Sequence, residues 1–81
     1  MNFNLLVQFL DGTEKTVSVK AADVVAFEER FDLSMASLEK NMRMTHMFFM
    51  AWSALRRDGE KKSFEDWLNL VDMVQAADSP K

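Results

Sequence analysis

Residues Met47 to Glu60 read MFFMAWSALRRDGE, a stretch that opens with six apolar residues in a row. Steps of three and four between apolar residues predict a helix over about 35–57. One apolar stripe of this helix contains Leu38, Met42, Thr45, Phe49 and Trp52. A second stripe, on another side, contains Met44, Met47, Phe48, Ala51 and Leu55. The helix is therefore apolar nearly all round from Met44 to Leu55, which indicates burial on more than one side.

Two interpretations of this helix remain open from the sequence. It is either a central core helix that the rest of the chain covers completely, or one stripe meets another protein or a second copy of the chain. The chain contains seven methionines, and flexible methionine side chains are common on adaptable binding surfaces. We therefore nominate the second stripe as a partner-binding surface, with Met44, Met47, Phe48, Ala51 and Leu55 as its residues.

The ends of the long helix carry recognisable signals. Ser34 or Ser37 is the expected N-cap, since a serine hydroxyl accepts a hydrogen bond from an unpaired N–H of the first turn. Arg56 and Arg57 are favourable at the negative C-terminal end. Gly59 is expected to end the helix with a left-handed backbone conformation.

Upstream, the chain alternates between apolar and polar residues, which predicts a β-hairpin over 2–20. Phe3, Leu5, Val7 and Phe9 share one face of the first strand. Asp11-Gly12 is a strong signal for a tight turn. A lone hairpin is barely stable in water, so its apolar face is expected to lie on the helices.

Two further helices complete the prediction, over about 22–31 and 64–76. Asp23 is a plausible cap or first-turn acid of the first, and Ser63 caps the second. The predicted fold is α+β, an N-terminal β-hairpin followed by three α-helices, with the middle helix longest and central. Residues 1–77 form the single predicted domain and 78–81 a flexible tail.

Composition narrows the class of protein. A chain of 81 residues with 48% hydrophobic residues fits one small folded domain. Its net charge of −3 argues against nucleic-acid binding, and it contains no cysteine for a disulfide or thiolate metal site. The start lacks the features of a signal peptide, and the apolar run at 47–52 is too short to span a membrane.

No residue pattern in the sequence predicts catalysis, a metal or a cofactor. His46 is the only histidine, and its helical neighbours offer no catalytic partner, so a structural role is expected. Trp52 and Trp67 are expected as core anchors, with interface hot spots as the alternative. The cations at 56–57 and 61–62 are interrupted by acids and are expected at a solvated helix end rather than on a phosphate backbone. We do not expect an enzyme.

Three segments resemble a known family: DVVAFEERF, HMFFMAWSALRRDG and SFEDWLNLV. Their patterns are F-E-x-x-F, A-W-x-A-L-x-R-x-G and S-F-x-x-W-L. In this order and spacing they resemble the tail assembly chaperones that long-tailed bacteriophages, especially those of actinobacteria, encode before the tape measure protein.

The resemblance implies a non-enzymatic protein that binds the long, largely helical tape measure protein until the tail tube polymerises around it. It also implies residence in the cytoplasm of the infected host, absence from the mature virion, and an ability to self-associate. No membrane, nucleic acid or cofactor is implied. Two alternatives remain: a structural component of the phage neck or tail, or a small effector that binds a host protein.

Overall fold

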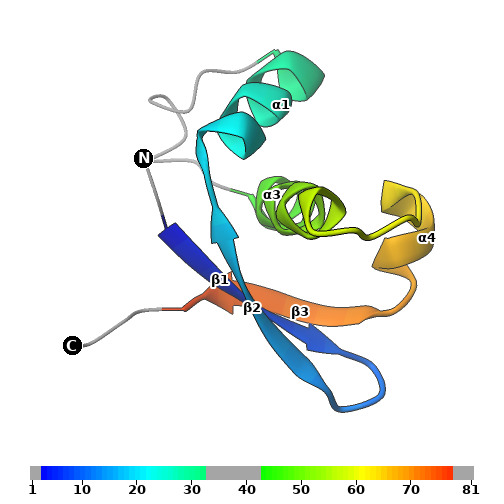
Figure 1. Cartoon of the computed structure of the whole chain (residues 1–81). Coiled ribbons are helices and arrows are strands. Elements are labelled where there is room, and N and C mark those ends of the chain that lie inside the picture. The colour runs from blue at the N-terminus through cyan, green and yellow to red at the C-terminus, as the bar shows by residue number, and fades with distance from the viewer. Residues whose placement is uncertain (1–2, 33–42, 78–81) are drawn as a thin grey trace.

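The computed structural model describes residues 3–32 and 43–77 and confirms the α+β fold, with a three-stranded antiparallel sheet in the order β2-β1-β3 (Figure 1). The predicted tail at 78–81 and the two candidate serine caps lie outside the described residues. The elements are β1 (Phe3–Phe9), β2 (Glu14–Val19), α1 (Ala21–Phe31), α3 (Met44–Arg57), α4 (Phe64–Leu68) and β3 (Val71–Ala76).

The predicted hairpin is confirmed as β1 and β2, which pair antiparallel with Leu5 opposite Val17. Gly12 has a φ of 93°, which explains why glycine follows Asp11 in the turn. Leu5, Val7, Val17 and Val19 are buried, so the alternating apolar residues form the inner face. The opposite face carries polar pairs, including a Ser18 hydroxyl that donates to the Asn4 side chain at 2.9 Å.

Helix α1 begins one residue before the predicted boundary, and α3 ends where predicted. The backbone N–H of Glu60 donates to the Leu55 carbonyl at 2.9 Å, and that of Gly59 donates to the Arg56 carbonyl at 3.1 Å. With Gly59 at a φ of 115°, these two bonds make a Schellman motif. The glycine that the sequence singled out therefore ends the helix as expected.

The predicted start of the long helix is wrong at Arg43, and its residues 35–42 lie outside the described part of the chain. Arg43 has an extended backbone, with φ −99° and ψ 158°, so α3 begins at Met44. His46 caps this end, because its Nδ1 accepts the backbone N–H of Arg43 at 3.2 Å.

The helix predicted over 64–76 is also wrong in its second half. Helix α4 ends at Leu68, and β3 pairs antiparallel with the free edge of β1. A bulge places Val71 opposite Phe9 and Val74 opposite Val7, although Phe9 and Val7 are only two residues apart. The three-residue spacing of Val71 and Val74 therefore matches a helical period, although both residues lie in β3.

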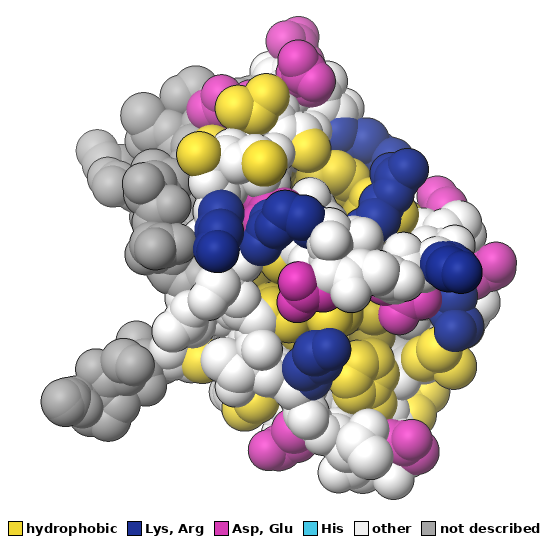
Figure 2. Space-filling model, viewed as in Figure 1, with side chains coloured by type: hydrophobic (Ala, Val, Ile, Leu, Met, Phe, Trp, Pro, Cys, Tyr) yellow, Lys and Arg dark blue, Asp and Glu magenta, His cyan; other side chains and the backbone are white. Residues whose placement is uncertain are grey.

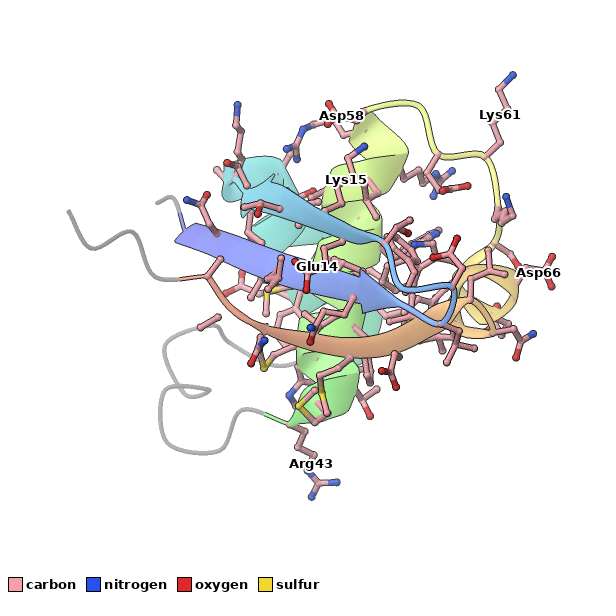
Figure 3. The ribbon with its side chains drawn as sticks, turned by 90° about the horizontal axis from the view of Figure 1, so that it is seen from below. Glu14, Lys15, Arg43, Asp58, Lys61 and Asp66 are labelled. Carbon is pink, nitrogen blue, oxygen red and sulfur yellow. The ribbon has the colours of Figure 1, made fainter. Side chains whose placement is uncertain are left out.

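Helix α3 lies at the centre of the fold. Figure 1 shows it between the sheet and α1, with α4 beside it, and Figure 3 shows it crossing the strands on one face of the sheet. It contacts α1, α4 and all three strands. Its buried residues are His46, Phe49, Met50, Ala51, Trp52, Ala54 and Leu55. Most of its apolar circumference is thus covered by its own chain.

Candidate protein-binding surfaces

The five nominated residues divide into an accessible group and a buried group. Ala51 and Leu55 are core residues, with exposed fractions of 0% and 5%. The nomination is therefore corrected at these two positions, because the sheet and α1 cover opposite sides of the middle of α3. Met44 is 40% exposed, and Met47 and Phe48 are half-buried at the edge of the core. We call Met44, Met47 and Phe48 the methionine edge.

A buried charge network fixes the C-terminal half of α3. Asp23, which is 1% exposed, accepts the backbone N–H of Lys20 at 2.9 Å and the Ser53 hydroxyl at 2.7 Å. The Arg57 guanidinium donates to the same carboxylate and, at 3.1 Å, to the carbonyl of Ser18. This network joins α1, α3 and β2. The sequence predicted Asp23 and Arg57 as helix-end charges but gave no sign that they pair, since they lie 34 positions apart.

The side of α3 away from the sheet packs through aromatic rings. The His46 ring meets Phe27 and Phe31 edge-on, each with centroids 5.2 Å apart. Contacts continue from Phe31 through Phe49 to Trp52. The buried ring and its bond to Arg43 give His46 the structural role that was expected.

Both tryptophans are core residues. Trp52 Nε1 donates to the carbonyl of Lys62 at 3.0 Å and so ties the connection between α3 and α4 to the helix. Trp67 is fully buried, and its Nε1 has no acceptor among the described residues. The prediction that both tryptophans are core residues is therefore confirmed.

A cleft of about 350 Å³ lies where the end of α1, the end of α3 and the start of α4 meet. We call it the basic cleft; its lining consists of Arg30, Trp52, Arg56, Lys61, Lys62, Ser63, Phe64 and Glu65. The guanidinium of Arg56 lies 5.4 Å from the Trp52 ring centroid, and that of Arg30 lies 5.7 Å from the Phe64 ring centroid. Figure 2 shows Lys and Arg side chains on this face of the molecule, with hydrophobic surface between them.

A smaller apolar hollow of about 320 Å³ lies at the hairpin tip, lined by Phe9, Leu10, Asp11, Thr13 and Leu70. Leu10 is the most exposed large hydrophobic residue of the described chain, at 66%. Beside it, the Thr13 hydroxyl and backbone N–H donate to the Asp11 carboxylate at 2.7 and 2.9 Å. These bonds, the hydroxyl first, hold the pKa of Asp11 below its usual range.

Within residues 3–32 and 43–77, no cluster of three or more His, Cys, Asp or Glu side chains is placed to hold a metal ion. None of the described helices has the length and hydropathy needed to cross a membrane.

No family model matches the chain, and no curated protein or solved structure is significantly similar to it. The likeness to tail assembly chaperones therefore stays a prediction from the three sequence segments.

Proposed function

We propose that this protein is a non-enzymatic chaperone of phage tail assembly that binds the tape measure protein through the methionine edge. The observation that carries the surface assignment is the exposure of Met44 beside half-buried Met47 and Phe48 at one end of α3. Flexible thioether side chains adapt to different apolar faces, which suits a long, largely helical client. The three phage-like segments support the choice of client.

The shape of the domain supports a binding role of this kind. The middle of α3 is buried in the core, so the edge is presented by a packed helix rather than by a loop. An amphipathic helix of the client would lay its apolar stripe against the edge and be protected from aggregation. In this proposal the protein acts in the cytoplasm of the infected host and is absent from finished virions.

Co-expression with the long helical protein encoded by the neighbouring gene tests the proposal. The wild-type chain should co-purify with that protein, and Met44→Glu should abolish or strongly weaken the association. Leu10→Glu is the matched control, because it places the same charge at another exposed apolar residue. Retention of the client by Met44→Glu would reject the surface, and failure of the wild-type chain to bind would reject the client.

Mass spectrometry of purified particles separates the proposal from a structural role in the neck or tail. A chaperone should be missing from the particles, whereas a stoichiometric amount would identify a virion component. Binding to a host protein in infected cells, with no binding to the tape measure protein, would instead identify an effector.

A further inference from the structure

The basic cleft is a second surface, built by the fold from three separate segments. Arg30 comes from α1, Arg56 from the last turn of α3, and Lys61 and Lys62 from the connection to α4. The sequence pattern indicates only the cations at 56–57 and 61–62, at an expected solvated helix end. It did not include Arg30, which lies 26 positions before Arg56 and reaches the cleft only through packing of α1 against α3.

The two arginines of the cleft are held in place before any ligand arrives. The Arg30 guanidinium lies over two rings, 5.6 Å from the Phe49 centroid and 5.7 Å from the Phe64 centroid. Arg56 lies over Trp52. A guanidinium whose face rests on an aromatic ring keeps its N–H edge free for a carboxylate, which it binds through two parallel hydrogen bonds.

The connection that carries the two lysines is also fixed. Trp52 holds the Lys62 carbonyl, and one Glu60 oxygen accepts the backbone N–H groups of Lys61 and Lys62, each at 3.1 Å. Little backbone conformational entropy is therefore lost when a ligand binds there.

Two of the cleft cations form long ion pairs with neighbouring carboxylates. Glu65 lies 3.9 Å from Arg30 with its side chain 75% exposed, and Glu60 lies 3.8 Å from Lys62. Of the charged residues that line the cleft, four are cations and one, Glu65, is an acid, so the lining carries positive charge, although the whole chain carries a charge of −3.

We propose that the basic cleft binds an acidic segment of a protein partner, whose Asp or Glu side chains pair with Arg30, Arg56 and the two lysines. Charge complementarity selects this occupant. A nucleic acid fits less well, because its phosphates form a continuous row of charge that would run past the cleft. The site is separate from the methionine edge and does not depend on the identity of the client.

Fluorescence anisotropy with a labelled oligoglutamate peptide tests the inference. Wild-type protein should bind the peptide, with affinity falling as salt is added, and should not bind a Gly/Ser peptide of equal length. Lys62→Glu should weaken binding about fivefold or more, whereas Lys15→Glu, the same charge reversal on β2, should change it by less than about twofold. Figure 3 shows Lys15 on the sheet and Lys61 in the connection to α4, in different parts of the molecule.

A second variant separates stacked geometry from charge alone. Arg30→Lys keeps the charge but loses the planar fork, so it should weaken peptide binding about threefold while the fold, followed by circular dichroism, stays unchanged. Equal losses from Lys62→Glu and Lys15→Glu would overturn the inference in favour of bulk electrostatics. Tighter binding of oligothymidylate than of oligoglutamate would overturn the inference and identify nucleic acid as the ligand. Self-association that is lost only in Lys62→Glu would identify a second copy of the chain as the ligand.

Discussion

The two ends of α3 expose different types of side chain, although both belong to one helix whose middle is buried in the core. The N-terminal end presents Met44, Met47 and Phe48, of which only Met44 is well exposed. The C-terminal end presents charge, and its two adjacent arginines have separate roles: Arg57 pairs with buried Asp23, while Arg56 lies over Trp52 at the basic cleft. The methionine edge and the basic cleft thus lie at opposite ends of the buried part of α3. The first suits an apolar partner and the second an acidic one.

The largest expected effect contrasts the middle of α3 with its first turn. Ala51→Glu should unfold the chain, because an unpaired carboxylate in a fully buried position costs several kcal/mol and small domains have little stability to lose. Met44→Glu should change the free energy of unfolding by only about 0.5 kcal/mol. Circular dichroism with urea titration measures both. Equal stability of the two variants would contradict the sealed middle of the helix.

The next effect concerns the charge network at the C-terminal end. Asp23→Ala should lower the free energy of unfolding by about 3 kcal/mol, because Arg57 loses its carboxylate and the Ser53 hydroxyl and Lys20 N–H lose their acceptor. Asp72→Ala removes an exposed acid from β3 and should stay within about 0.5 kcal/mol of wild type. Similar denaturation midpoints for the two variants would show that the network contributes nothing.

A smaller change should link stability to the basic cleft. Trp52→Phe keeps a ring beneath Arg56 but removes the Nε1 bond to the Lys62 carbonyl, which should destabilise the domain by about 1 kcal/mol. The variant should also bind oligoglutamate more weakly, because the connection that carries Lys61 and Lys62 is no longer held by Trp52. Unchanged peptide affinity in a folded Trp52→Phe variant would show that binding in the cleft does not depend on the hydrogen bond from Trp52 to Lys62.

The smallest effect, at the hairpin turn, supplies a baseline away from both ends of α3. The Thr13 donors lower the pKa of Asp11, so the carboxylate stabilises the fold above its unfolded pKa of about 4. This contribution is lost as the pH falls through the lowered pKa of the folded state. Asp11→Asn should therefore reduce the loss of stability between about pH 6 and pH 3. Parallel wild-type and Asp11→Asn pH profiles, from thermal unfolding, would exclude the effect.

Local signals in the sequence predicted much of the fold. Strand alternation and Asp11-Gly12 predicted the hairpin, and Gly59 predicted the end of α3, because each is decided by neighbouring residues. Strand β3 was missed because the bulge opposite Phe9 gives Val71 and Val74 a helical spacing. The start of α3 was misplaced because the apolar spacing continues across Arg43, whose backbone is extended and whose N–H donates to His46 Nδ1.

The candidate surfaces were harder to predict because they depend on packing between distant segments. The sequence identified Met44, Met47 and Phe48 but included Ala51 and Leu55, since a stripe on a helical projection does not reveal what will cover it. It likewise placed Arg57 at a helix end without its partner Asp23. Arg30 joins the cleft only when α1 packs on α3, and no local pattern records that contact.

The position of β1 between β2 and β3 has a consequence for biosynthesis. Strand β1 leaves the ribosome before β3, so it forms its hairpin with β2 early but keeps its other edge unpaired until β3 has been synthesised. During that interval its exposed N–H and C=O groups are open to strands of other nascent chains. Translation speed between the codons for β2 and β3 should therefore influence the yield of native protein.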